Sequence, residues 1–232
     1  MSELRNSPAA VCVSRRALLA SAGIVGLSAL LPGVVSVARA QRRGDGPSEV
    51  PLEELLKPGS QPDLVLGSAD AKVTVVEYAS MTCGHCAHFH NDVFPEIKKK
   101  YIDTGKIRFI MREFPLDNLA AAAAMLARCA GEGKTFPMIE SLFHTQNEWA
   151  FKQGNPVPRL FEIAKQAGFT QETFDKCLTD QKLLDAVNAT RQRANEKFGV
   201  NSTPSFFVNG KRLAAPTMAE FDKAIEPLLT KG

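Results

Sequence analysis

Residues 73–86 read Val73-Thr-Val-Val-Glu-Tyr-Ala-Ser-Met-Thr-Cys83-Gly-His-Cys86, and this stretch decides the fold. Its first seven residues are mostly β-branched or aromatic, which is typical of a buried strand. The residues from Cys83 to about Tyr101 favour a helix, which we expect to be interrupted at Pro95. The sequence therefore predicts a strand, a short loop and a helix that starts at a Cys-x-x-Cys.

The spacing of Cys83 and Cys86 brings two sulfurs close enough on the first helical turn to form a disulfide. The first sulfur would lie beside unpaired backbone N–H groups and the positive end of the helix dipole. Both effects stabilise a thiolate and lower the pKa of a thiol. A Cys-x-x-Cys in this strand–helix context is typical of a thioredoxin-like redox motif.

Other uses of the same cysteines fit the sequence less well. A zinc site could be built from Cys83, Cys86, His88 and His90, but four ligands so close together would distort the helix that the strand context predicts. Covalent haem attachment needs a histidine directly after the second cysteine, and that position is Ala87. An inert disulfide closing so short a loop would constrain little of the unfolded chain. A redox pair is favoured, with metal binding as the alternative.

The elements on both sides extend this unit into an α/β pattern. Short apolar runs predict strands at 63–67, 106–113 and 205–209, and a further short strand from Leu213. Asn209-Gly210 predicts a tight hairpin turn. Between the strands, helices are expected at 120–130, 136–145, 158–166, 171–179 and 183–198, and a closing helix at 217–229. The plan is βαβ, a block of helices, then ββα.

The chain has 232 residues, a net charge of +3 and 5 cysteines. Residues 1–40 carry paired arginines, an apolar run over 17–37 and a terminal Ala38-Arg39-Ala40, the order of parts in a secretory signal peptide. The paired arginines resemble a twin-arginine signal. The alternative is a retained membrane anchor, since the apolar run is long enough to span a bilayer. Residues 41–62, rich in proline and glycine, are expected to be a leader or linker with a short helix at 52–56.

Cleavage after residue 40 would change the composition of the mature chain. Residues 1–40 hold the whole net charge of +3, so the remainder is formally neutral and gives no case for nucleic-acid binding. Cys12 would also leave, and the remaining cysteines are Cys83, Cys86, Cys129 and Cys177. An even number of cysteines in an oxidising compartment favours pairing.

The segment Glu77–Cys86, the block of helices and Val200-Asn-Ser-Thr203-Pro204-Ser-Phe-Phe-Val208 together resemble the DsbA family of periplasmic thiol:disulfide oxidoreductases. The match is closest to the alphaproteobacterial branch and covers about 63–229. The resemblance implies an α/β, thioredoxin-like fold over 63–232 with a helical insertion at about 118–198.

The resemblance also implies roles for individual residues. Cys83 resembles the exposed nucleophile, and Cys86 resembles the buried resolving cysteine. Pro204 falls where the family has a cis-proline facing the disulfide. Such a proline would present the Thr203 backbone to a substrate strand. The alternative is an ordinary trans-proline at the beginning of an edge strand. Glu77 falls where the family has a buried acid that assists proton transfer, and the alternative is a side chain pointing to solvent.

Two further features follow from the same comparison. The residues between the two cysteines are Gly84-His85, where the best-known DsbA proteins have Pro-His. The same Gly-His pair resembles that of eukaryotic protein disulfide isomerases. His85 could stabilise the Cys83 thiolate, which supports an oxidant of milder strength.

Cys129 and Cys177 are expected to form a second, structural disulfide that stabilises the fold by about 4 kcal/mol. The alternative is two separate buried thiols.

The resulting functional hypothesis is an exported oxidase that introduces disulfides into reduced or unfolded client proteins. It would be a periplasmic monomer, anchored to the membrane if the signal is retained, without metal or cofactor, and reoxidised by a membrane or soluble redox partner. A disulfide isomerase or reductase of the same fold is the alternative, followed by a non-redox protein that binds metal or peptides. His88, His90 and His144 are expected to have no special role.

Overall fold

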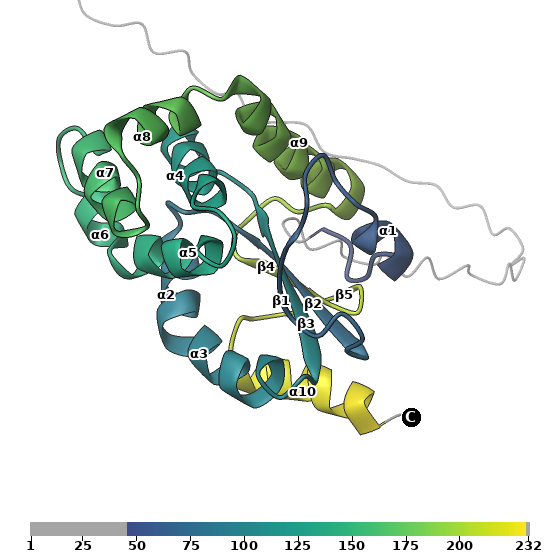
Figure 1. Ribbon diagram of the computed structural model, residues 1–232. Coiled ribbons are helices and arrows are strands. Elements are labelled where there is room, and N and C mark those ends of the chain that lie inside the picture. Colours follow the sequence, from purple (N-terminus) through teal and green to yellow (C-terminus); the bar gives the residue numbers. More distant parts are fainter. Residues whose placement is uncertain (1–45, 231–232) are drawn as a thin grey trace, which may run out of the picture. The chain divides into compact units, whose positions relative to one another are not determined.

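Strand β2 (Val73–Ala79) lies at the centre of the molecule, and all of its residues are buried. The computed structural model describes residues 46–230, so the signal-peptide prediction for residues 1–40 falls outside the described part. β2 pairs in parallel with β3 (Ile107–Glu113) and antiparallel with β4 (Ser205–Val208). β1 (Leu64–Gly67) and β5 (Lys211–Arg212) complete a five-stranded sheet in the order β1-β3-β2-β4-β5 (Figure 1).

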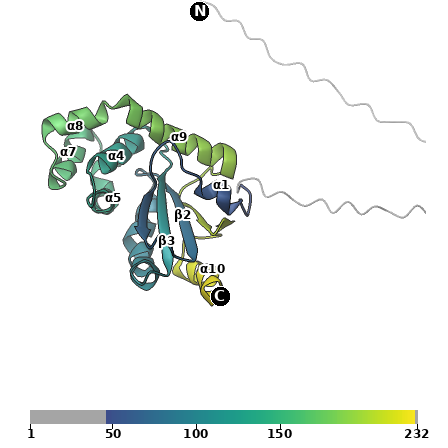
Figure 2. The ribbon, with the colours of Figure 1, turned by 45° about the vertical axis from the view of Figure 1, so that its right-hand side comes forward.

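Side chains alternate along β2 and divide the core between the two faces of the sheet. Val73 and Val75 join a large apolar cluster with the helix that follows Cys83 and with α10 (Met218–Thr230). Val76 and Tyr78 join a second cluster on the other face, which α1 (Leu52–Leu56) and α9 (Gln181–Phe198) cover (Figure 2). Burial on both faces explains why the strand is so apolar.

The helix after Cys83 is irregular. It consists of α2 (Gly84–His88), a π-helical segment η1 (Phe89–Val93), α3 (Phe94–Ile97) and a second π-helical segment η2 (Lys98–Ile102). Pro95 stands in the first turn of α3, where a missing backbone N–H is tolerated. The expected interruption at Pro95 thus takes the form of a wider helical turn just before the proline.

A block of helices is inserted between β3 and β4, which confirms the predicted thioredoxin-like α/β fold with a helical insertion. It contains α4 (Asn118–Cys129), α5 (Thr135–His144), α6 (Gln146–Trp149), α7 (Val157–Gln166), α8 (Gln171–Leu178) and α9. The short helix α6 was not predicted, because a single turn has no periodicity to detect. Over residues 46–230, no helix is long and apolar enough to cross a membrane.

Cys129 and Cys177 are joined by a disulfide across the helical block. Cys129 is the last residue of α4 and Cys177 lies in α8, with a Cα–Cα distance of 6.2 Å and a sequence separation of 48. The bond therefore closes a long loop within the insertion. Of the two arrangements considered for these cysteines, the structure has the paired one.

The described part of the predicted leader or linker, residues 46–62, packs against the sheet. Val50 and Leu55 are buried in the second cluster, and the Val50 N–H donates to the Gly210 carbonyl. The buried Arg112 donates to the Leu55 carbonyl and forms a two-pronged ion pair with Asp63. These apolar and charged contacts attach a segment whose composition resembles a free linker.

The chain turns between β4 and β5 at Asn209-Gly210, as predicted, with positive φ angles of 46° and 87°. The second strand, however, is Lys211–Arg212 and not a run starting at Leu213. In a two-residue hairpin the partner strand begins directly after the turn, so Lys211 pairs with Val208. The predicted position of this strand was therefore a few residues too late.

We expect that replacing Cys129 and Cys177 with alanine lowers the free energy of unfolding by about 4 kcal/mol, because the unfolded chain regains the freedom of the long loop. Urea unfolding should be measured in a background with Cys83 and Cys86 also replaced by alanine, so that only the second disulfide differs. An unchanged unfolding midpoint would contradict a stabilising role for this bond.

Candidate functional site

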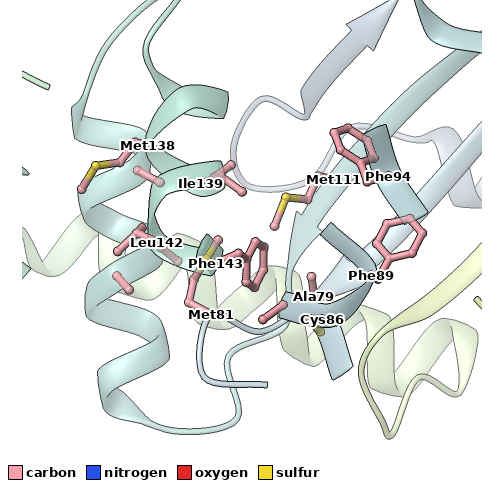
Figure 3. Close-up of a cluster of buried hydrophobic side chains, with 14 of the residues drawn as sticks. Ala79, Met81, Cys86, Phe89, Phe94, Met111, Met138, Ile139, Leu142 and Phe143 are labelled. Atoms are coloured by element: carbon pink, nitrogen blue, oxygen red, sulfur yellow. The ribbon is translucent and has the colours of Figure 1, made fainter. Parts of the chain in front are cut away.

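Cys83 and Cys86 stand in contrasting environments at the start of α2. Cys83 is the N-cap of the helix, and its sulfur accepts a hydrogen bond from the Cys86 N–H at 3.4 Å. Gly84 and His85 are exposed, so the first cysteine lies at the surface although its own side chain is only 8% exposed. Cys86 is fully buried and lies beside Ala79 at the edge of an apolar cluster (Figure 3). The structure holds both as thiols.

The surroundings of Cys83 stabilise its thiolate. Hydrogen bonding from the Cys86 thiol is the largest effect and lowers the pKa of the Cys83 thiol to about 5, with further contributions from Thr203 and from the backbone N–H groups of Cys86 and His85. Partial burial opposes this shift without reversing it. His85, expected to act through its imidazole, contributes here through its backbone, and its side chain is exposed.

Cys86 is perturbed in the opposite direction. Burial raises the pKa of the Cys86 thiol well above its usual value, and the hydrogen bond to Cys83 and the negative charge of Glu77 raise it further. Cys86 therefore keeps its proton under conditions in which Cys83 is ionised. A split of this kind suits thiol–disulfide exchange, in which one sulfur must react as a thiolate and the other must hold a proton.

The Thr203–Pro204 peptide bond is cis and lies against the first cysteine. In the neutral thiol, Cys83 Sγ donates to the Thr203 carbonyl at 3.3 Å. The Thr203 hydroxyl is buried and has no partner within residues 46–230, so it is free to donate to the sulfur once the thiol ionises. Cys83, Cys86, Thr203 and Pro204 are thus brought together as the sequence predicted.

Glu77 is fully buried, which decides between the two orientations considered for it. Its Oε2 lies 2.9 Å from Nε2 of His90, and both side chains are at most 1% exposed. His90 was expected to have no special role. A signal was present, because His90 follows Cys86 by four residues and so lies on the same inward face of the helix, one turn further on.

The other two histidines of this helix, His85 and His88, are exposed. His88 pairs with Asp92 one turn later, while His90 pairs with Glu77. The four side chains considered for a zinc site therefore do not converge. Within the described part of the chain, no group of three or more histidine, cysteine, aspartate or glutamate side chains is placed to hold a metal ion.

The helical insertion anchors the loop before Cys83. The buried Gln146 of α6 donates from Nε2 to the carbonyls of Met81 at 2.8 Å and Cys83 at 3.0 Å. The Thr82 hydroxyl donates to Asp117, whose other oxygen caps α4. Sequence reasoning missed Gln146, since a glutamine in a single helical turn carries no local signal of such a contact.

A comparison with known proteins agrees with this geometry. The family model described as "Thioredoxin" matches residues 60–227. The crystal structure of Wolbachia pipientis alpha-DsbA1 is 34% identical, with a TM-score of 0.71, and the match covers 78% of this chain and 97% of that one. The chain belongs to the DsbA family. Its resemblance to the alphaproteobacterial branch is confirmed by this neighbour.

Sequence relatives of this DsbA-family chain carry related names. A "Putative protein-disulfide oxidoreductase" of Rickettsia bellii is 38% identical over 168 residues, which are 71% of this chain and 65% of the relative. A "Probable disulfide bond formation protein D" of Bacillus anthracis is 30% identical over 176 residues, which are 72% of this chain and 78% of the relative. The chain thus spans somewhat less than two thirds of the length of its Rickettsia bellii relative.

The reduced DsbA-family chain should titrate its Cys83 thiolate with a midpoint near pH 5, and Cys86→Ala should raise that midpoint because it removes the largest stabilising hydrogen bond. The pKa of the Cys83 thiol is lower in the folded protein than in the unfolded chain, so the thiolate stabilises the reduced fold. This stabilisation is complete above the ordinary thiol pKa of 9.0 and is lost as the pH falls through about 5. Ultraviolet thiolate absorbance measures the midpoint. An ordinary thiol midpoint in the parent protein would contradict this assignment.

Gln146→Leu should destabilise the protein by about 2–4 kcal/mol, because two buried carbonyls would lose their donor. The matched control is Gln192→Leu, since Gln192 donates to Glu196 on an exposed helix surface and its loss should change stability by less than about 0.5 kcal/mol. Urea unfolding compares the two variants. Equal stability of both would show that the loop before Cys83 does not depend on Gln146.

Proposed function

We propose that this chain is a thiol:disulfide oxidoreductase that works mainly as an oxidase, introducing disulfide bonds into client proteins through Cys83 and Cys86. The observation that supports this direction is the split between the two thiols, with the pKa of Cys83 lowered to about 5 and that of Cys86 raised. A stabilised thiolate favours the reduced enzyme, and the disulfide form is therefore oxidising.

The reaction would proceed by two thiol–disulfide exchanges. A client thiolate attacks Sγ of Cys83 in the disulfide form, a bond forms between client and Cys83, and the bond between Cys83 and Cys86 breaks. The electron pair goes to Cys86, which takes up a proton. A second client thiolate then attacks the client sulfur of the mixed disulfide, Cys83 leaves as its stabilised thiolate, and the client departs oxidised by two electrons.

The client would lie against the loop that holds Pro204. A groove of about 310 Å³ runs beside this loop, with Ser202, Pro204 and Phe206 among its lining residues. Thr203 would present its backbone to an extended client segment next to Cys83, as the family resemblance implies. The lining combines apolar side chains with the hydroxyls of Ser202 and Ser205, a mixture that suits an extended segment with both apolar side chains and main-chain polar groups.

The setting of this activity follows from the N-terminal pattern and the family. We propose export to the periplasm with residues 1–40 as a signal peptide of twin-arginine type, or membrane attachment if that segment is retained. The chain would act as a monomer on reduced or unfolded proteins, and a membrane or soluble redox partner would reoxidise it. The dithiol itself carries the electrons, so the proposed reaction calls for no cofactor.

Isomerase or reductase activity is the second candidate, and the Gly84-His85 pair favours it because protein disulfide isomerases share these inner residues. The reduction potential of the Cys83–Cys86 pair in glutathione buffers distinguishes the directions. A potential of about −120 mV supports an oxidase, one of about −180 mV supports an isomerase, and one of about −270 mV supports a reductase.

Cys86→Ala should accumulate mixed disulfides with client proteins that already carry a disulfide. The Cys83 thiolate can still attack that bond, one client sulfur leaves as a thiolate, and no Cys86 remains to attack Cys83 and displace the client. Cys83→Ser should accumulate none, since it lacks the accessible sulfur. Non-reducing gels of cells that express each variant measure the trapping. Equal trapping by both variants would contradict the assignment of Cys83 as nucleophile and Cys86 as resolving residue.

A further inference from the structure

The hydrogen-bonded pair of Glu77 and His90 is almost completely buried. Both side chains are at most 1% exposed, with Nε2 of His90 and Oε2 of Glu77 separated by 2.9 Å. The other polar atom of each, Oε1 of Glu77 and Nδ1 of His90, is buried without a hydrogen-bond partner in the part of the chain that the structure describes. Burying polar atoms unpaired costs stability, so packing alone does not explain this pair.

Aromatic rings hold the His90 imidazole in place. Its ring stacks on Phe143 with 4.4 Å between centroids and an interplanar angle of 17°, and Phe89 and Phe94 approach it at 5.3 and 5.0 Å. Phe143 belongs to α5 of the helical insertion, whereas Glu77 belongs to β2. The ring is therefore fixed between the insertion and the sheet, with one nitrogen on Glu77.

On its inner side the pair acts on Cys86, because Glu77 is among the groups whose electrostatic influence raises the pKa of the Cys86 thiol. On the outer side, His90 lines a groove of about 570 Å³ between the helix after Cys83 and α5, where the titratable or charged side chains are Lys98, Glu140 and His144. The pair thus lies between a buried thiol and a groove open to solvent.

We propose that His90 is a positioning residue that orients Glu77 and relays protons between Glu77 and the groove, so that Cys86 gains and loses its proton without opening the core. This inference rests on the proposed function, because only a redox-active pair requires Cys86 to change its protonation in each turnover.

The relay moves one proton inwards for each disulfide that is reduced. When the bond between Cys83 and Cys86 breaks, the electron pair goes to Cys86 Sγ, which takes the proton of the Glu77 carboxyl. Nε2–H of His90 passes its proton to Glu77 while Nδ1 takes one from water in the groove, so the imidazole stays neutral. Reoxidation runs the same transfers in reverse. An imidazole suits this task because it can accept a proton on one nitrogen as it releases one from the other.

The test uses the full chain with the substitutions His90→Gln and His90→Ala. The amide of the glutamine variant could still donate to Glu77 but could not relay a proton, whereas the alanine variant leaves space beside the groove for added imidazole. His88→Gln is the matched control, since His88 lies two residues away on the same helix but is exposed and pairs with Asp92. Stopped-flow mixing with a cysteine-containing peptide measures the rate of disulfide reduction across about pH 5–8.

Both His90 variants should reduce their disulfide about tenfold more slowly than the parent, with an altered pH profile, and His88→Gln should match the parent. Imidazole should restore the rate of His90→Ala but not that of His90→Gln, which a merely structural role would not produce. If the alanine variant does not fold, the rate and pH profile of the glutamine variant decide.

A parental rate and pH profile in His90→Gln would overturn the relay and leave the proposed function intact. So would a slow His90→Ala that imidazole does not restore, because the loss would then be structural. A parent protein that exchanges no disulfide with the peptide would overturn the proposed function, and the relay with it.

Discussion

The electrostatic coupling between the two thiols of Cys83 and Cys86, with the Cys86 N–H donating to Cys83 Sγ at 3.4 Å, is the interaction on which this site depends. It lowers the pKa of the Cys83 thiol and raises that of the Cys86 thiol, and so gives two chemically identical residues opposite tendencies to ionise. This coupling requires Cys83 at the N-cap of a helix and Cys86 inside the core. The position of β2, which ends just before the loop, and the packing of α2 on the sheet satisfy both requirements.

Buried polar groups around this pair come from three separate parts of the chain. Thr203 approaches Cys83 from the loop before β4, Gln146 holds the preceding loop from α6, and Glu77 reaches towards Cys86 from β2. Each polar group is destabilising in an apolar core unless it is paired. The helical insertion therefore does more than cover the sheet, because it supplies the donor of Gln146 and the ring of Phe143 that fixes His90.

The periphery is tied to this core by bonds of a different kind. The disulfide between Cys129 and Cys177 joins α4 to α8, and Arg112 attaches the segment before β1 through Asp63 and the Leu55 carbonyl. The short helix predicted at 52–56 in that segment is confirmed as α1, while its contact with a residue as distant as Arg112 has no signal in the local composition.

Local pattern in the sequence was sufficient for the strand at 73–79, the Cys-x-x-Cys at a helix start, the block of helices and the Asn209-Gly210 turn, because each depends on residues close together in the chain. The tertiary structure alone decided that Glu77 is buried, that His90 is its partner and that Gln146 anchors the loop before Cys83. These outcomes depend on which surfaces meet when distant segments pack. A side chain's neighbours, and hence its burial and charge environment, are properties of that packing and have no period in the sequence.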